Sequence, residues 1–214
     1  MADEPATAAP VIRSPFGPIC LWLLIQMTAL AISTTRVPFY AAKSFPEPAE
    51  ILAAGVMLTF QIGAAAMLFP YLLRDWRATG LVVIASWPFM ILAQILTSEP
   101  GFRTYLTAAP FVAVWLVGLA LWRSILRSPR WLAAAATVAT LITFGGPLLY
   151  YFRSEYRTGM TTYLPGSWGP LCGALTVSAR DPVHRGAWFF AALHLAVAVM
   201  AYGIAKLVAW RAAR

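Results

Sequence analysis

Six apolar stretches separated by polar connections limit what this chain can fold into. Each has close to the ~20 residues that a helix needs to cross the hydrocarbon core of a bilayer, and none contains Asp, Glu, Lys or Arg. A transmembrane strand would alternate apolar and polar residues, whereas these stretches are apolar all round. They predict an all-α, polytopic membrane protein with a single six-helix transmembrane domain over residues 14–205. The expected spans are 14–35, 51–73, 78–98, 104–122, 131–152 and 186–205.

The charge composition agrees with this reading. Charged residues make up 11% of the 214-residue chain, against about 25% in a soluble domain, as expected if most residues lie in lipid, where charge is costly. The net charge of +8 is explained by Arg and Lys at the ends of spans, where they orient and anchor the helices. We therefore expect the lipid bilayer as a partner and no nucleic acid, because no stretch outside the spans could form a binding module.

The short connections set the expected orientation. The turns "RDWRA" (74–78) and "RSILRSPR" (123–130) are dense in Arg, while the connections on the opposite side are longer and mixed in charge. The positive-inside rule gives such short loops the greatest weight. We expect both termini to be cytoplasmic in a cell membrane of the bacterial inner-membrane type. Residues 1–13 are expected to be a disordered N-terminus, and 206–214 a basic C-terminus.

The longest connection, residues 153–185, lies on the extracytoplasmic side in this topology. Unstructured loops of more than about 15 residues are uncommon and often functional. The segment "PGSWGP" supplies turn residues for a reversal, and "GPLCGALTVSA" is apolar but too short to span. We expect a half-buried outer cap between the fifth and sixth spans, with Tyr163, Trp168 and Leu171 as its apolar members. The alternative is a covering segment that binds nothing.

Four spans each carry one strongly polar side chain in their interior. An unpaired amide in hydrocarbon costs a few kcal/mol, so these side chains should face the bundle interior and bond across helices. They are either packing contacts or a polar track for a substrate, and the sequence leaves both open. The four residues are Gln26, Gln61, Gln94 and His194.

The second span contains a ladder of small residues, Gly55, Thr59 and Gly63. Small side chains at intervals of four residues let a neighbouring helix approach closely. The ladder is expected to pack within the monomer or against a second subunit.

Recognisable catalytic motifs are missing from the sequence. It has no His-Glu-x-x-His zinc motif, no Gly-x-Ser-x-Gly nucleophile elbow and no pair of acids within the spans. His184 and His194 are separated by about 15 Å of regular helix, which is too far for both to bind one haem iron. We therefore expect no catalytic residue, metal or cofactor. A membrane enzyme that uses His194 or Cys172 is kept as an alternative.

The missing intramembrane charge also bears on transport. Ion-coupled carriers usually hold acidic residues within the membrane, and this chain has neither those nor a Walker motif. Six spans, cytoplasmic termini and a long outer segment before the last span are similar in layout to the permease subunits of type-2 ATP-binding-cassette exporters. No residue-level motif carries this likeness. It implies an integral membrane subunit involved in transport whose energy comes from a partner.

Other protein subunits are therefore expected as partners, either a cytoplasmic ATPase or a second copy of the chain. The alternative function is a non-catalytic structural subunit of a larger membrane complex.

Overall fold

The computed structural model describes residues 16–41, 49–97, 102–156, 170–171 and 184–213. This part of the chain is all-helical, with six helices that are long and apolar enough to cross a membrane. The predicted all-α fold with six helices of this length and apolarity is confirmed. The helices are α1 (Phe16–Ala41), α2 (Ala49–Leu72), α3 (Trp76–Thr97), α4 (Phe102–Ile125), α5 (Pro129–Tyr156) and α7 (His184–Ala212).

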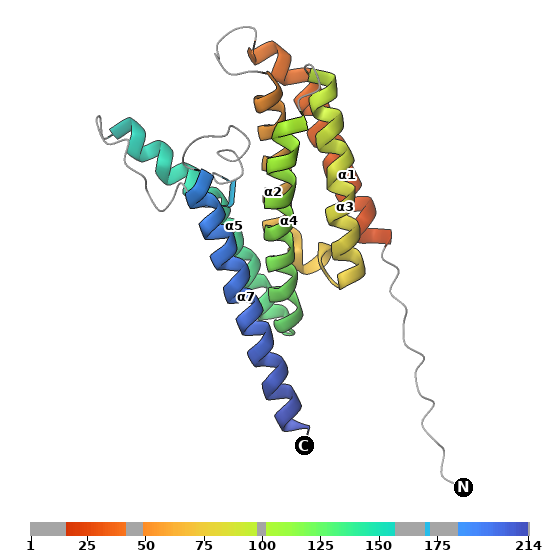
Figure 1. Ribbon diagram of the computed structural model, residues 1–214, viewed down its shortest axis with the longest axis vertical. Coiled ribbons are helices and arrows are strands. Elements are labelled where there is room, and N and C mark those ends of the chain that lie inside the picture. The colour runs from red at the N-terminus through yellow and green to blue at the C-terminus, as the bar shows by residue number, and fades with distance from the viewer. Residues whose placement is uncertain (1–15, 42–48, 98–101, 157–169, 172–183, 214) are drawn as a thin grey trace.

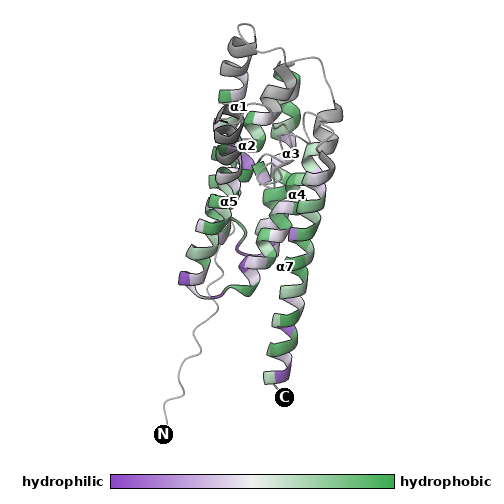
Figure 2. Ribbon diagram, turned by 90° about the vertical axis from the view of Figure 1, so that its left-hand side faces the viewer, coloured by the Kyte–Doolittle hydropathy of each residue, from purple (hydrophilic) through white to green (hydrophobic). Residues whose placement is uncertain are grey.

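The helices run up and down along the long axis of the molecule (Figure 1). The start of α1, the α2–α3 turn, the α4–α5 turn and the end of α7 all lie toward the same end of the bundle. The two Arg-rich turns, 74–78 and 123–130, therefore share one end with the last turns of α7. Figure 2 shows mostly hydrophobic residues along the coloured parts of the helices, with hydrophilic residues at their lower ends and a few within the bundle.

Local sequence explains where two of the helices begin. Asp75 precedes α3, and its Oδ1 accepts a hydrogen bond from the Ala78 backbone N–H at 2.8 Å, which satisfies one of the unpaired donors of the first turn. Pro129 is the first residue of α5, a position where the missing N–H and the fixed φ of proline are favourable. Each of these helices therefore begins where its local sequence favours helix initiation.

Four helices run past the predicted end of their span. The helices continue to Ala41 (α1), Ile125 (α4), Tyr156 (α5) and Ala212 (α7), so most of the 206–214 segment belongs to a helix. Apolarity marks the membrane thickness, but Arg and Lys are good helix formers, and their aliphatic stems can lie along apolar surface while the charge reaches water. The helix therefore does not end where the apolar run ends.

The buried core lies among α1, α2, α3 and α4, where large side chains such as Trp22, Met57, Phe69 and Phe111 are buried. Over the apolar window of each helix, 56% of α2 and of α4 is buried, against 17% of α5 and of α7. The helix α5 packs against α2, and α7 packs against α4. These two peripheral helices lie on the side of the bundle away from α1 and α3 (Figure 1).

Two glycines allow the peripheral helices to come close. A Cβ on Gly63 of α2 would lie 2.7 Å from Cζ of Phe144 on α5, and a Cβ on Gly118 of α4 would lie 2.7 Å from Nδ1 of His194 on α7. Distances this short exclude any larger residue without movement of a helix or a ring. Of the predicted small-residue ladder, Gly63 thus faces α5 within the monomer, while the Thr59 hydroxyl donates to the Gly55 carbonyl of its own helix at 2.8 Å.

An arginine joins α4 to the end of α2. The Arg123 Nε donates a hydrogen bond to the Pro70 carbonyl at 2.9 Å. Carbonyls in the last turn of a helix have no partner within that helix, so the guanidinium satisfies one of them. This contact holds α2 and α4 together at the end of the bundle that carries the Arg-rich turns.

Candidate functional site

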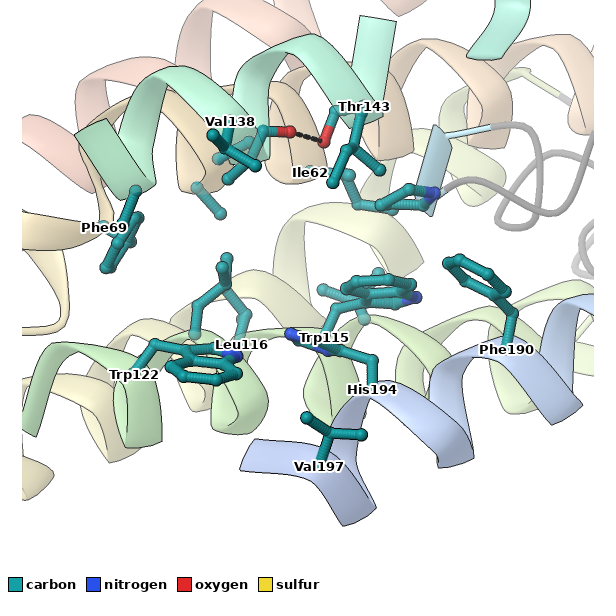
Figure 3. A pocket seen from close by; sticks show the side chains of 18 of the residues that line it. Ile62, Phe69, Trp115, Leu116, Trp122, Val138, Thr143, Phe190, His194 and Val197 are labelled. Atoms are coloured by element: carbon teal, nitrogen blue, oxygen red, sulfur yellow. Dashed lines mark hydrogen bonds between the residues drawn. The ribbon is translucent and has the colours of Figure 1, made fainter. Parts of the chain in front are cut away.

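A cavity of about 390 Å³ lies between α2, α4, α5 and α7 (Figure 3). Its volume falls within the ~300–1,000 Å³ usual for sites that bind small molecules. Of its described lining residues, all but a few are apolar. The lining consists of Ile62, Ala65, Ala66, Phe69, Val112, Trp115, Leu116, Leu119, Trp122, Ala135, Val138, Ala139, Ile142, Thr143, Pro170, Phe190, Leu193, His194 and Val197.

The cavity has a mouth between the two peripheral helices. Lining residues of α2 and α4 are mostly buried, whereas Val138 of α5 and Val197 of α7 line the cavity while remaining 53% and 41% exposed. Val138 stands nine residues into α5, about 14 Å along the helix. This position lies within the apolar window Pro129–Leu148, which is long enough to cross a membrane.

A stacked pair of rings forms the most polar part of the wall. The Trp115 ring of α4 and the His194 ring of α7 have centroids 4.4 Å apart and planes inclined by 20°. Figure 3 shows the two rings lying one over the other, across the space from Thr143 of α5. Gly118, one turn after Trp115, leaves room for the imidazole against the α4 backbone.

Two nitrogen atoms of this pair lack partners. Trp115 Nε1 and His194 Nδ1 are buried and make no hydrogen bond within the part of the chain that the structure describes. Leaving such a group unpaired in an apolar setting costs ~1–3 kcal/mol. The Thr143 hydroxyl is different, because it donates to the Ala139 carbonyl of its own helix at 2.7 Å.

Further aromatic contacts fix α7 against α4. The Phe111 and Trp188 rings meet edge-on with centroids 5.3 Å apart, and the Trp115 and Phe190 centroids are 6.4 Å apart. Pairs of this kind add ~0.5–1.5 kcal/mol beyond the area they bury. They hold His194 in position at the cavity wall.

A second polar cluster lies among α1, α2 and α3. The Gln61 amide Nε2 donates to Gln26 Oε1 at 2.9 Å and to the Ser86 carbonyl at 3.3 Å. The Trp22 indole donates to the Ser86 hydroxyl at 3.2 Å. Both glutamine side chains are 0% exposed, and Gln26 Nε2 and Gln61 Oε1 have no partner among the described residues. The cluster joins three helices in the core.

The four predicted polar residues do not share one place in the structure. Gln26 and Gln61 are bonded to each other, and neither is among the described residues that line the cavity. His194 lines the cavity instead. Gln94 belongs to α3, but its side chain lies outside the described residues. The structure thus separates a buried amide pair from a cavity histidine.

Little of the predicted outer cap is described. Tyr163, Trp168 and Cys172 lie outside the described residues. Leu171 is buried, with 6% of its surface exposed, and the neighbouring Pro170 lines the cavity. Within the described ranges, no group of three or more His, Cys, Asp or Glu side chains could hold a metal ion.

Sequence reasoning missed Trp115 and Gly118. Transmembrane tryptophans gather at the two membrane interfaces, so a tryptophan in the middle of the fourth span was the available signal for an indole with an internal role. Gly118 carried no signal of its own, because glycine is frequent in transmembrane helices for many reasons.

Comparison with known protein families, with curated proteins and with solved structures gives no match for this chain. The function is therefore inferred from the chemistry of the cavity. Its described lining is almost entirely apolar, and none of these lining residues is Asp, Glu, Lys or Arg. Such a site can bind an uncharged, apolar molecule by burial.

Proposed function

We propose that this protein is an integral membrane subunit involved in transport, and that the cavity between α2, α4, α5 and α7 is its substrate site. The observation that carries the proposal is an apolar cavity lined by the apolar windows of four helices, with its exposed lining residues on α5 and α7. A substrate that dissolves in the bilayer would enter sideways between these two helices. The energy would come from a partner, a cytoplasmic ATPase, as in the exporters that the layout resembles.

The proposal includes an orientation and an outer cap. With both termini in the cytoplasm, the end of the bundle that carries the Arg-rich turns is the inner end. The segment Tyr156–Leu175 then covers the outer end of the cavity. Two observations support the cap: Pro170 lines the cavity, and Leu171 is buried.

The test fills the cavity and leaves the rest of the surface unchanged. Ala139 lines the cavity on α5, and Ala139→Phe places a ring in it. Ala134→Phe is the matched control, because Ala134 is exposed on the same helix and is not among the lining residues. Lipid extracts are compared by mass spectrometry from the parent cell, a deletion strain and strains whose single copy carries one of the variants.

The expected result is that the same apolar molecule accumulates in the deletion strain and in the Ala139→Phe strain, with the Ala134→Phe strain like the parent. A deletion strain with an unchanged lipid profile would refute transport of a membrane-soluble molecule. An Ala139→Phe strain that matches the parent, while the deletion strain does not, would show that the cavity is not the substrate site.

A second candidate is a non-catalytic structural subunit of a larger membrane complex. It is favoured by the broad apolar surfaces of α5 and α7, of which only 17% is buried over each apolar window. In that role the two helices would pack against other subunits. Purification from native membranes in a mild detergent separates the candidates, because a co-purified ATPase supports the first and co-purified redox or synthase subunits support the second.

A further inference from the structure

The cavity between α2, α4, α5 and α7 is closed on three sides and open on the fourth. The helix α5 packs on α2, α2 on α4 and α4 on α7, and along the described residues no comparable packing joins α5 to α7. We propose that a hydrocarbon chain of a membrane lipid enters through this open side and lies along the cavity, while the polar head of the lipid stays outside. The proposal names the ligand class of the proposed transport site and so rests on that site.

The exposure of the lining residues marks the open side. The lining residues of α2 and most of those of α4 are buried. Four lining residues are between 41% and 53% exposed, and all of them belong to α5 or α7: Val138, Ile142, Leu193 and Val197. They lie within the apolar windows Pro129–Leu148 and Gly186–Ala212. With these helices across the bilayer, as the proposed function has them, the open side of the cavity faces lipid chains.

The lining also indicates the shape of the cavity. On α4 it extends from Val112 to Trp122, about 15 Å along the helix, which is half of the ~30 Å hydrocarbon core and so the extent of one leaflet. The volume of about 390 Å³, divided by this length, gives a mean cross-section of about 26 Å². A helix with its side chains is about 10–12 Å in diameter, so a helix of a partner subunit is too wide. A single extended chain has the required narrow form.

The chemistry of the walls favours hydrocarbon over water. The described lining is almost entirely aliphatic and aromatic, and the Thr143 hydroxyl already donates to the Ala139 carbonyl of its own helix at 2.7 Å. A buried water needs about two to four polar partners, whereas apolar cavities stay dry and take up apolar ligands. An empty cavity forfeits van der Waals contacts along its walls. A lipid chain at the open side therefore gains contacts by entering.

The same walls exclude the head of the lipid. None of the described lining residues is Asp, Glu, Lys or Arg, so a charged or zwitterionic head would lose its hydration without gaining a partner of opposite charge. The site therefore recognises the chain. Lipids with the same chains and different heads should bind alike.

The experiment detects the chain inside the cavity by nuclear magnetic resonance. The full-length protein is deuterated except at its Leu and Val methyl groups and placed in nanodiscs of dimyristoyl phosphatidylcholine. Nuclear Overhauser cross-peaks between the chain methylene protons and the protein methyl groups are recorded, and discs of chain-deuterated lipid give the background. Leu116 of α4 is the reporter, because it is only 1% exposed and lines the cavity.

Two other leucines are matched controls. Leu58 of α2 is 0% exposed and is not among the lining residues, so it should give no cross-peak, whereas Leu141 of α5 is 65% exposed and should give a strong one. Leu116 should give a cross-peak although it is nearly as buried as Leu58. Val112 and Leu119 should also give cross-peaks, because they line the cavity on either side of Leu116 and a chain that lies along it contacts both.

A variant that fills the cavity completes the test. Ala139→Phe places a ring in the cavity and should weaken the Leu116 cross-peak several-fold, with the Leu141 cross-peak unchanged. Ala134→Phe, at an exposed position of the same helix, should leave both unchanged. If Ala139→Phe does not fold, the comparison of Leu116 with Leu58 in the unmodified protein still decides. Discs of dimyristoyl phosphatidylglycerol should give the same cross-peaks as phosphatidylcholine, because the head is not recognised.

Four results would overturn the proposal: no cross-peak at Leu116 while Leu141 gives one, equal cross-peaks at Leu116 and Leu58, an unchanged Leu116 cross-peak in folded Ala139→Phe, or cross-peaks that require the anionic head. A chain in the cavity together with an unchanged lipid profile of the deletion strain would establish the binding site and refute the transport role. A changed profile without a chain in the cavity would refute this inference alone.

Discussion

The hydrogen bond between Gln26 of α1 and Gln61 of α2 can be tested by its contribution to the free energy of unfolding. The perturbations are Gln26→Met, Gln61→Met and the double variant, because methionine is close to glutamine in shape and has no amide. Met27→Leu is the control. Met27 follows Gln26 in the chain, but its side chain is 56% exposed, so this substitution should leave stability unchanged.

The hydrogen bonds set the expected magnitudes. Gln61→Met removes both bonds made by Nε2, at 2.9 and 3.3 Å, and leaves the Gln26 amide buried without a partner. Leaving such a group unpaired costs ~1–3 kcal/mol. Gln26→Met should cost less, ~0.5–1.5 kcal/mol, because Gln61 Nε2 keeps the Ser86 carbonyl at 3.3 Å.

The double variant removes every polar atom of the pair, including Gln26 Nε2 and Gln61 Oε1, which have no partner among the described residues. Replacing both partners by apolar groups of similar shape is close to neutral. The double variant should therefore be more stable than Gln61→Met. The coupling energy is the difference between the effect of the double variant and the sum of the two single effects. We expect it to be at least ~0.6 kcal/mol in magnitude, because hydrogen bonds between transmembrane helices have that value on average.

The free energy of unfolding can be measured in mixed micelles as the fraction of denaturing detergent rises, with helicity followed by circular dichroism. A double variant that is destabilised by the sum of the two single variants would refute the pairing. Equal effects of the two single variants would refute the role assigned to the Ser86 carbonyl.

Three further predictions follow from the packing, the helix caps and the charge pattern. Gly118→Ala should lower stability by ~1–3 kcal/mol, because the added Cβ overpacks against His194. Gly80→Ala should raise stability by ~0.5–1 kcal/mol, because no atom lies within 4 Å of the added Cβ. Thermal unfolding of both variants in detergent checks that the two effects have opposite signs. Asp75→Ala should lower the free energy of unfolding by ~1 kcal/mol through loss of the α3 cap. Asp75→Asn should keep most of this stability, because asparagine also caps and the exposed Arg74–Asp75 ion pair at 3.4 Å adds little. An Asn variant as unstable as the Ala variant would contradict the capping account. In a chain without native cysteines, Met160→Cys should react with an impermeant maleimide added outside intact cells and Arg127→Cys should not, and the reverse pattern would invert the proposed topology.

The sequence by itself determined the membrane class, the number of spanning helices and the presence of polar side chains within them. The reason is that the bilayer acts on each segment separately: a helix must be about 20 residues long and nearly free of charge whatever its neighbours are. Residues 131–152 therefore predicted a helix without any knowledge of α2. The ends of the helices were less well determined, because the backbone of α5 and α7 continues beyond the apolar runs.

Only the tertiary structure decided which polar residues meet and where a cavity lies. Gln26 and Gln61 are 35 residues apart and bonded, while His194 faces Trp115 across a different pair of helices. In lipid every helix face is apolar, so hydropathy does not show which face turns inward. The pairing is decided by steric fit at positions such as Gly63 and Gly118, where the lack of a Cβ admits Phe144 and His194. The cavity exists because α5 packs on α2 and α7 on α4, and that choice depends on contacts between segments that are distant in the chain.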